Sequence, residues 1–265
     1  MKKILVLLTA LSVLLLAACG DQKTKEPAPT KDKLATIQES GTIKIGLEGA
    51  FPPFSYHDAK GTLTGFEYEI ADQIAKDLGV KPEYIETKWD SLIAGLDVDK
   101  YDFVINNIAV TDERKEKYDF TSPYMKSNAV IAIHEDDDSI KKASDYKGKK
   151  SSQTVTSNFA QIARDLGAEI VPTEDLTKSI ELVAEKRADG TIHDQVTFLT
   201  YFKEKPESPL KLVDEVLQSV DIAILLNQKQ DPLRDEINAI IKKRSEDGTF
   251  TKISEKYFDS DIIVH

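Results

Sequence analysis

One arginine in the segment AVTDERKEKYDFTSPY, residues 109–124, is placed where it could bind a ligand. Thr111 is a favourable helix N-cap residue, so we expect a helical turn directly after the strand-like run FVINNIAV. Arg114 lies in that turn, and a guanidinium group can form two parallel hydrogen bonds to a carboxylate. In open α/β sheets, ligands bind where strand ends face helix starts. The simpler alternative is a solvent-exposed run of alternating charges over residues 112–117, which also fits the neighbours of Arg114.

The sequence lacks the motifs of several common enzyme classes. It contains no Gly-x-Gly-x-x-Gly after the first strand-like segment, no phosphate-binding loop and no Gly-x-Ser-x-Gly. The histidines at positions 57, 134, 193 and 265 do not have the spacing of metal ligands. The acidic run at residues 135–139 lacks the glycine and the distal glutamate of a calcium-binding loop. We therefore expect no catalysis, no metal and no cofactor.

The composition argues against two kinds of partner. The sequence carries 35 Lys and Arg residues against 46 Asp and Glu residues, a formal net charge of −11. Such a chain would repel nucleic-acid phosphates and would not be held by the charge of an anionic membrane. A length of 265 residues, 40% of them hydrophobic, is sufficient for one large or two medium domains with buried cores.

The N-terminus has the pattern of a secretory signal peptide, which we place at residues 1–18. A basic start, MKK, precedes an apolar run over residues 4–18, which is shorter than the roughly 20 residues of a membrane-spanning helix. The segment LAAC, residues 16–19, resembles the lipobox of bacterial lipoproteins, and this resemblance implies lipidation of Cys19. A plain signal peptide with a chance cysteine is the alternative. Cys19 is the only cysteine, so the chain forms no internal disulfide.

The residues that follow the cysteine have the composition of a linker. Residues 20–33 contain Pro27 and Pro29 and no large apolar side chain. Such a segment cannot bury enough surface to offset the entropy of ordering, so we expect a lipidated, flexible tether over residues 19–33. A lipid and a tether would hold the folded body at the extracellular face of the bacterial cell membrane.

From residue 42 onward, strand-like and helix-like segments alternate. TIKIGLE alternates apolar and polar positions, as a strand does. GFEYEIADQIAKDLG, residues 65–79, places Phe66, Ile70, Ile74 and Leu78 on one face of a helix that Gly79 would end. Two such β-α-β series of similar size predict an α/β protein with two lobes and mostly parallel sheets.

Other elements follow from the same patterns. We expect one helix over WDSLIAGLD (residues 89–97) and strands over YDFVINNI (101–108), NAVIAIH (128–134) and DIAILLN (221–227). A long helix should start near residue 231, with Asp231 as its N-cap and Pro232 as its first residue.

The order and spacing of several sequence blocks resemble the polar amino-acid solute-binding proteins of ABC transporters, family 3, as found in Gram-positive lipoproteins. The blocks cover nearly the whole chain after the tether: GTIKIGLEGAFPPFSY, GTLTGFEYEIADQIAKDLGV, WDSLIAGLDVDKYDFVINNIAVTDERKEKYDFTSPY, SSQTVTSNFAQIA and KRADGTIHD. The resemblance implies a two-lobed, periplasmic-binding-protein-like (Venus flytrap) fold with a two-strand hinge. It also implies a protein that closes on an amino acid and delivers it to the membrane permease of an ABC importer. We expect a monomer.

The lobes should exchange the chain twice, near residues 127–131 and 219–224. Lobe 1 then comprises residues 34–128 and 222–265, and lobe 2 comprises residues 129–221. A ligand that contacts both lobes would stabilise the closed state, because only that state makes both sets of contacts.

The resemblance assigns ligand-binding roles to residues on both lobes. Arg114 matches the arginine that binds the α-carboxylate of the ligand. Thr156 and Ser157, at the start of a lobe 2 helix, match hydroxyl groups that donate to the same carboxylate. Asp194 matches the aspartate that binds the α-ammonium group. Ordinary helix capping is the alternative role for these three lobe 2 residues.

Five further residues match family positions around the ligand. Asn107 and Ala109 match strand-end positions that offer hydrogen bonds, and Ala109 could do so only through its backbone. Phe51 and Trp89 match aromatic positions that flank the ligand, although either could belong to the core. Glu48 matches an acidic position near the ammonium group or the side chain of the ligand in some members.

The sequence also departs from its relatives. His193, Gln195 and Val155 stand where relatives often have smaller or different residues. The segments ETKWDSLIAGLD and QTVTSNFAQ are most similar to the cystine-type branch, so cystine is our candidate ligand. One alternative is a dehydratase-like enzyme of the same fold, with His193, Glu48 or Asp194 as the acid or base in the cleft. The other alternative is a sensory or adhesive surface lipoprotein.

Overall fold

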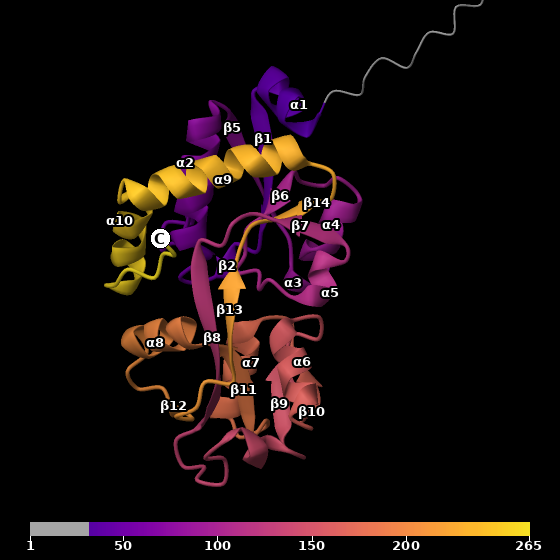
Figure 1. Ribbon diagram of the computed structural model, residues 1–265. Helices are drawn as coiled ribbons and strands as arrows, with labels where there is room; N and C mark the ends of the chain where they lie inside the picture. Colours follow the sequence, from indigo (N-terminus) through magenta and orange to yellow (C-terminus); the bar gives the residue numbers. More distant parts are fainter. Residues whose placement is uncertain (1–31) are drawn as a thin grey trace, which may run out of the picture. The chain divides into compact units, whose positions relative to one another are not determined.

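Two β-sheets organise residues 32–265, the part of the chain that the computed structural model describes (Figure 1). The first sheet has the strand order β5 (Lys81–Glu86), β1 (Thr42–Leu47), β6 (Phe103–Val104), β14 (Leu225–Asn227) and β7 (Tyr118–Phe120). The second has the order β10 (Glu169–Pro172), β9 (Lys150–Gln153), β11 (Gly190–Asp194), β8 (Met125–His134) and β12 (Leu210–Leu212), and β13 (Gln218–Ile222) also pairs with β8. A small sheet joins β2 (Ala50–Phe51), β3 (Ser55–His57) and β4 (Leu63–Thr64).

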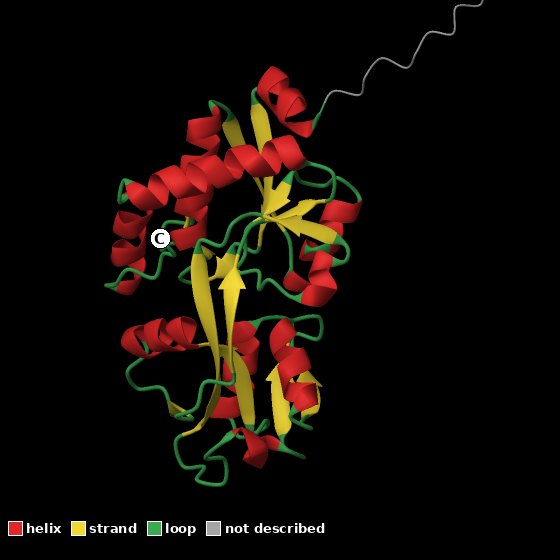
Figure 2. Ribbon diagram, in the orientation of Figure 1, coloured by secondary structure: helices red, strands yellow, loops and turns green. Residues whose placement is uncertain are grey.

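Helices accompany both sheets (Figure 2). Those near the first sheet are α1 (Lys33–Ser40), α2 (Phe66–Leu78), α3 (Trp89–Leu92), α4 (Ala94–Asp97), α5 (Asp112–Lys115), α9 (Asp231–Glu246) and α10 (Thr249–Phe258). Those near the second sheet are the 3₁₀ turn η1 (Ala143–Tyr146), α6 (Asn158–Asp165), α7 (Leu176–Ala184) and α8 (Gln195–Glu204). The two-lobed α/β fold expected from the sequence is therefore confirmed.

The expectation of mostly parallel sheets is wrong, because both sheets are mixed. Strand β1 runs parallel to β5 and β6, but β14 runs antiparallel to β6 and β7. Strand β9 runs parallel to β10 and β11, but β8 runs antiparallel to β11, β12 and β13. The antiparallel strands are those next to the crossings between the lobes. A chain that returns from the other lobe enters the sheet from the opposite end, which reverses its direction.

Each sheet buries both of its faces. Along β6, Phe103 packs into one apolar cluster and Val104 into another, and along β8 the residues Ala129 and Val130 likewise belong to different clusters. Successive side chains of a strand point to opposite faces, so each sheet lies between two apolar layers. This arrangement fixes the strand ends from which the site residues extend.

Strands β8 and β13 form the two-strand connection between the lobes (Figure 1). They pair from Met125 opposite Ile222 to Ala129 opposite Gln218, a region that overlaps the expected crossings near residues 127–131 and 219–224 but begins one or two residues earlier. Met125 and Ile222 pack with the first sheet, whereas Ala129 packs with the second. We use the names lobe 1 (residues 34–128 and 222–265) and lobe 2 (residues 129–221) for the predicted boundaries, which remain our proposal.

Helix α2 follows the predicted pattern closely. Its buried residues include Phe66, Ile70, Ile74 and Leu78, and it ends at Gly79, which has a φ of 73°. The backbone N–H of Gly79 donates to carbonyl groups of the last turn, which satisfies an acceptor that the helix itself leaves free. The apolar stripe and its glycine cap therefore suffice to specify this element.

Several predicted elements are shorter than expected. The single helix over residues 89–97 is divided into α3 and α4, and the strand over 101–108 is paired only at Phe103–Val104. The backbone turns sharply after that strand, since Asn107 has a φ of 49°. The strand over 221–227 is divided because the chain passes there from one sheet to the other. Gln230, not Asp231, occupies the N-cap of α9.

The sequence reading missed helix α1, which begins at Lys33 inside the predicted tether. Asp32 caps it by accepting a hydrogen bond from the backbone N–H of Ala35 at 2.8 Å, and Lys33 forms an ion pair with Asp102 at 2.7 Å. The rest of the tether, the predicted signal peptide and Cys19 lie outside the described residues. Within residues 32–265, no helix is both long enough and apolar enough to cross a membrane.

Candidate ligand-binding site

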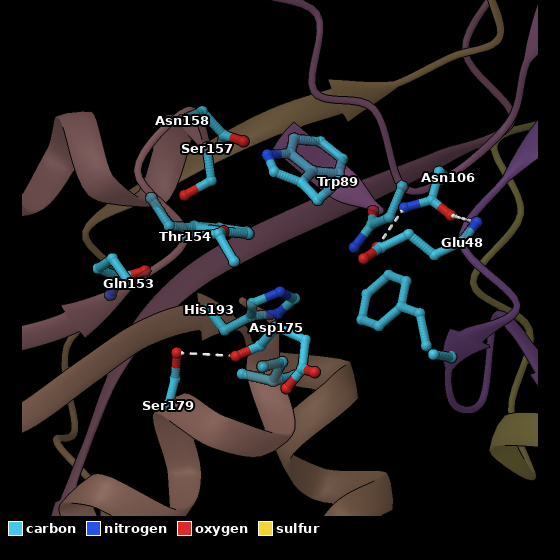
Figure 3. Close-up of a pocket in the computed structure, with 15 residues that line it drawn as sticks. Glu48, Trp89, Asn106, Gln153, Thr154, Ser157, Asn158, Asp175, Ser179 and His193 are labelled. Atoms are coloured by element: carbon cyan, nitrogen blue, oxygen red, sulfur yellow. Dashed lines mark hydrogen bonds between the residues drawn. The ribbon is translucent and has the colours of Figure 1, made fainter. Parts of the chain in front are cut away.

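Two adjoining cavities lie at the junction of the lobes, and we call them the inner and outer cavities. The inner cavity is lined by Glu48, Ala50, Phe51, Trp89, Asn106, Asn107, Gln153, Thr154, Ser157, Asn158, Phe159, Asp175, Leu176, Ser179 and His193 (Figure 3). The outer cavity is lined by residues that include Asp90, Thr111, Arg114, Thr156 and Arg164. Trp89, Ser157 and Asn158 line both cavities. Of the nine predicted binding residues, seven therefore line one of these two neighbouring spaces.

Aromatic rings form the apolar part of the inner cavity. Phe51 stacks on the buried Phe54, with ring centroids 4.8 Å apart. The His193 ring lies against Phe159 at 4.4 Å and against Phe51 at 5.5 Å. Burial lowers the pKa of His193 to about 3, so this ring is neutral near pH 7. Phe51 thus belongs to the apolar core and also lines the cavity, so its two predicted roles, in the core and beside the ligand, are compatible.

Glu48 enters the inner cavity from the end of β1. Its backbone N–H donates to Asn106 Oδ1 at 2.9 Å, and its own Oε2 accepts a hydrogen bond from Asn106 Nδ2 at 2.8 Å. Burial raises the pKa of Glu48 to about 7, against the lowering effect of the hydrogen bond from Asn106. The carboxyl group is therefore held in one place and is poorly solvated.

Arg114 lines the outer cavity beside Trp89. Thr111 caps the short helix α5 by accepting a hydrogen bond from the backbone N–H of Arg114 at 3.3 Å, as predicted. The guanidinium group donates to the Ala109 carbonyl at 2.9 Å, and its carbon lies 5.6 Å from the centroid of the Trp89 ring. The solvated interpretation of the charge run is thus wrong for Arg114, which is partly buried, and right for exposed neighbours such as Lys115. Ala109 itself lines neither cavity.

The hydroxyl residues of α6 have partners within the protein. Ser157 is the N-cap of α6 and accepts a hydrogen bond from the backbone N–H of Ala160 at 3.0 Å. Thr156 Oγ1 donates to Asp90 Oδ1 at 2.7 Å, which joins lobe 2 to lobe 1. Capping is therefore the observed role of Ser157, and Thr156 bridges the cleft.

Asp194 is buried and caps α8. It is 1% exposed, accepts a hydrogen bond from the backbone N–H of Val196 at 3.3 Å, and accepts another from Asn107 Nδ2 at 3.0 Å. Burial raises the pKa of Asp194 to about 6. Asp194 lines neither cavity in this conformation, so it would meet a ligand only if Asn107 moved away from it.

The sequence reading missed a buried carboxyl group behind the site, that of Glu67. Its Oε1 accepts hydrogen bonds from the backbone N–H of Asn107 at 2.6 Å and from the hydroxyl group of Tyr124. Burial raises the pKa of Glu67 to about 7. A signal was present, because Glu67 precedes Ile70 and Ile74 by three and seven residues and therefore lies on the apolar face of the helix.

Most of the lobe 2 lining was also missed. Gln153, Thr154, Asn158, Phe159, Asp175 and Ser179 all line the inner cavity. Asp175 had a signal, since it precedes α7 and caps it by accepting a hydrogen bond from the backbone N–H of Lys178 at 2.8 Å. No group of three or more His, Cys, Asp or Glu side chains in residues 32–265 is arranged to hold a metal ion.

Comparisons with known proteins agree with this geometry. Residues 43–260 match the bacterial extracellular solute-binding proteins, family 3. The chain is 36% identical over 266 residues to the L-cystine-binding protein TcyA of Bacillus subtilis (strain 168), and the match covers 98% of each chain.

Solved structures give the same result. An ancestral arginine-binding protein bound to arginine has a TM-score of 0.77 and 33% identity, with 82% of this chain and 98% of that chain covered. The unliganded, open L-cystine solute receptor of Neisseria gonorrhoeae has a TM-score of 0.60 and 36% identity, with 89% of this chain and 100% of that chain covered. The lower score against an open form fits the hydrogen bonds that join the two lobes here. The chain thus belongs to the family 3 bacterial extracellular solute-binding proteins.

Proposed function

We propose that this protein binds an amino acid between its lobes, with L-cystine as the first candidate, and presents it to the permease of an ABC importer. The observation that supports this most directly is the composition of the two cavities. A partly buried guanidinium group, capped helix starts, carboxyl groups and aromatic rings meet there, and they come from both lobes. These are the groups that a zwitterion with a side chain requires.

The carboxylate of the ligand would bind at Arg114. Burial lowers the pKa of Arg114 to about 10, so the group remains a cation near neutral pH. One of its N–H groups is used by the Ala109 carbonyl, which leaves further donors because a guanidinium group has five N–H bonds. The start of α6 at Ser157 adds backbone N–H groups and the positive end of the helix dipole.

The ammonium group of the ligand would bind at Asp194 and Asn107. Asp194 is an acceptor, and Asn107 Oδ1 is buried without a hydrogen-bond partner among the described residues. An ammonium group carries three donors and could satisfy both. In the present conformation Asn107 Nδ2 donates a hydrogen bond to the Asp194 carboxylate. We infer that this hydrogen bond breaks when the cleft opens, and that the ammonium group of the ligand takes its place when the cleft closes again.

The binding cycle follows from where these groups lie. The groups for the carboxylate include Arg114 of lobe 1 and Ser157 of lobe 2, and those for the ammonium group include Asn107 of lobe 1 and Asp194 of lobe 2. A ligand gains all these contacts only when the lobes are together, so it shifts the population toward the closed form. A permease that recognises the closed form could then distinguish the loaded protein.

Names of relatives support the choice of cystine, since TcyA and the gonococcal receptor are both described as binding it.

We further propose that the mature protein is a monomer, held by a lipid on Cys19 at the outer face of the membrane. Mass spectrometry of the membrane-extracted protein, with and without Cys19→Ala, tests the lipid: the diacylglycerol mass should disappear in the variant.

Thermal unfolding of the purified protein against the twenty amino acids and cystine tests the proposed function. A ligand that binds only the folded state raises the midpoint by mass action. We expect cystine to raise it, and Arg114→Ala to remove the shift. Arg187→Ala, which removes an exposed arginine paired with Glu185 in lobe 2, is the matched control and should keep the shift. If no amino acid shifts the midpoint, the proposal fails.

One observation favours an enzymatic alternative. Glu48 lies in the inner cavity with its pKa raised to about 7, which suits a general acid. A dehydratase of this fold would turn over prephenate-like substrates, and Glu48→Gln would abolish that turnover. Absence of turnover, together with lost cystine uptake in a deletion strain, would favour transport over both the enzyme and the adhesive or sensory lipoprotein.

A further inference from the structure

Glu67 places a carboxyl group in the core of lobe 1, where an apolar side chain would be expected. It is 0% exposed and lies on the apolar face of α2 with Phe66 and Ile70. Burial raises its pKa to about 7, and the nearby carboxyl groups of Asp194 and Glu48 contribute to the rise. Burying such a group costs free energy, whereas a leucine of similar size would pack there without that cost. The presence of Glu67 is therefore explained by what its oxygen atoms bind, and not by packing.

One oxygen atom of Glu67 joins two segments of the chain. Its Oε1 accepts a hydrogen bond from the backbone N–H of Asn107 at 2.6 Å and another from the hydroxyl group of Tyr124. Asn107 lines the inner cavity, and Tyr124 directly precedes β8, one of the two strands that connect the lobes. A hydrogen bond from a backbone N–H to a carboxylate is charge-assisted and therefore among the stronger ones in proteins. The carboxyl group thus ties a residue of the site to the connection between the lobes.

The backbone of Asn107 needs this support because its conformation is unfavourable. Its φ of 49° lies in the left-handed region, which residues other than glycine rarely adopt. In this turn the Asn107 side chain reaches lobe 2, where Nδ2 donates to Asp194 at 3.0 Å. Without the acceptor on Glu67, the N–H of Asn107 would lose a hydrogen bond in the core, and the turn would relax to recover one. The Asn107 side chain would then leave its place beside Asp194.

The preceding residue, Asn106, is held in a different way. Its side chain exchanges two hydrogen bonds with Glu48, at 2.9 and 2.8 Å, so both of its polar groups are used within the protein. Asn107 is held through its backbone instead, and its Oδ1 is buried without a hydrogen-bond partner among the described residues. A buried carbonyl oxygen without a donor is costly, so a ligand with N–H groups would supply what is missing. The support from Glu67 thus leaves the Asn107 side chain available to a ligand.

We propose that Glu67 is a positioning residue for the α-ammonium group of the ligand, and that it acts by holding Asn107 in the left-handed turn that presents its side chain to that group. The inference rests on the proposed function, because it takes the ammonium group to bind at Asn107 and Asp194. Glu67 itself lines neither cavity, so it reaches the ligand only through Asn107. Loss of Glu67 should therefore weaken recognition of the ammonium group and leave recognition of the carboxylate at Arg114 intact.

Two ligands that differ only in the ammonium group provide the test. Cystine carries this group at both ends, and dithiodipropionate is the same chain without either ammonium group. Titrations followed by the fluorescence of Trp89, which lines both cavities, give the two dissociation constants. For the wild type we expect dithiodipropionate to bind at least about tenfold more weakly, the usual effect of a lost charge-assisted hydrogen bond. The ratio of the two constants is the measured quantity, because a general loss of structure would weaken both ligands.

Variants of Glu67 separate the hydrogen-bond acceptor from the volume of the side chain. Glu67→Leu keeps a similar volume and has no acceptor, so it should bind cystine about tenfold more weakly and dithiodipropionate nearly as the wild type does. Glu67→Gln retains a carbonyl oxygen for Asn107 and should keep the ratio within about twofold of the wild type. Glu67→Asp, which withdraws the acceptor by one methylene, replaces the leucine variant if that one does not fold, and it should also weaken cystine selectively.

A control and a double variant locate the effect. Glu69 lies on the same helix and accepts a hydrogen bond from Tyr257 at 2.5 Å, so Glu69→Leu removes a carboxyl group away from the site and should leave both affinities unchanged. Asn107→Gly removes the side chain and keeps the left-handed turn accessible, so it should weaken cystine by about tenfold. Adding Glu67→Leu to Asn107→Gly should cost at most about twofold more, because Glu67 acts through the side chain that is already absent.

The outcomes separate this inference from the proposed function. If Glu67→Leu weakens both ligands equally, or if its loss adds in full to that of Asn107→Gly, the positioning role is overturned while amino-acid binding stands. A Glu67→Gln variant with the same ratio as Glu67→Leu would overturn it too, because the charge and not the acceptor would then matter. If the wild type binds neither cystine nor any other amino acid, the proposed function fails, and this inference fails with it.

Discussion

Glu67 shows how one buried carboxyl group can organise a site that it does not line. It fixes the backbone of Asn107, whose φ is 49°, and the side chain of Asn107 reaches Asp194 in lobe 2. The hydroxyl group of Tyr124, in the segment that leads into β8, also donates a hydrogen bond to Glu67. Helix α2 is therefore connected to both lobes through Asn107.

Glu67 should make stability depend on pH. Because burial raises its pKa to about 7, the folded state binds more protons than the unfolded state between about pH 4.5 and 7. The free energy of unfolding should therefore fall as the pH rises through this window, by up to about 1.4 kcal/mol per pH unit from this group, and level off above it. Glu67→Gln should reduce that slope. Urea unfolding at about pH 5 and about pH 7.5 measures it, and an unchanged slope in the variant would refute the assignment.

Asp194 should make ligand binding depend on pH in the opposite direction. A ligand ammonium group prefers the ionised carboxylate, and burial raises the pKa of Asp194 to about 6. Affinity should therefore rise with pH from about 5 to about 7, with up to about a tenfold gain per unit below the pKa, and then level off. Calorimetry in buffers of different ionisation enthalpy should detect proton release. Asp194→Asn should bind weakly at every pH, and a pH-independent wild type would count against Asp194 as the ammonium partner.

At the scale of the element, α2 is held at both ends by glycine. Gly65 precedes the helix with a φ of 132°, and a Cβ there would lie 2.2 Å from the backbone oxygen of Phe54. Gly79 follows the helix with a φ of 73°, and a Cβ there would meet nothing within 4 Å. Both glycines thus have a positive φ, but Gly65 is extended with a ψ of 168° whereas Gly79 is in the left-handed helical region, and only Gly65 allows a close approach between segments.

Substitution of these glycines separates backbone strain from the close approach. Gly79→Ala should lower the free energy of unfolding by about 1 kcal/mol, which is the cost of placing an alanine residue in the left-handed backbone conformation. Gly65→Ala adds a clash with immobile backbone and should cost several kcal/mol, on the order of the largest single-residue effects. Chemical denaturation of both variants gives the comparison. If both variants lose the same free energy of unfolding, the close packing of Phe54 against the start of α2 does not add to the cost of a side chain at position 65.

Elements with local signals could be predicted from the sequence, and the site could be predicted in part. The stripe from Phe66 to Leu78 and the cap at Thr111 each arise within a few residues, so α2 and the turn of Arg114 followed from the sequence alone. Asp175 joins the cavity only because α7 packs beside β9, a contact that no local pattern encodes. The antiparallel course of β14 likewise depends on the return from lobe 2.

At the scale of the whole body, the lobes are joined by polar contacts at the rim of the cleft. Lys88 pairs with Glu174 at 2.5 Å, and Thr156 donates to Asp90 at 2.7 Å. The inner cavity has a volume of only about 40 Å³, against about 680 Å³ for the outer cavity. An amino acid side chain can enter the inner cavity only if the lobes first separate.

The rim contacts should therefore act on release of the ligand. Lys88→Ala removes an exposed pair that exists only when the lobes are together, so it should speed dissociation by about two- to threefold and leave association nearly unchanged. The effect should shrink at high salt. Trp89 is the only tryptophan in the sequence and lines both cavities, so the association and dissociation rates of the ligand can be measured from its fluorescence in a stopped-flow instrument. Lys178→Ala, which removes a pair within α7, is the control, and an equal effect there would exclude a role for the rim.

The most direct test of the central claim is a crystal structure of the protein with the amino acid that gives the largest thermal shift. We predict a ligand between closed lobes, with its α-carboxylate within hydrogen-bonding distance of Arg114 and its α-ammonium at Asp194. A ligand bound outside the two cavities, or one whose carboxylate faces away from Arg114, would contradict the claim.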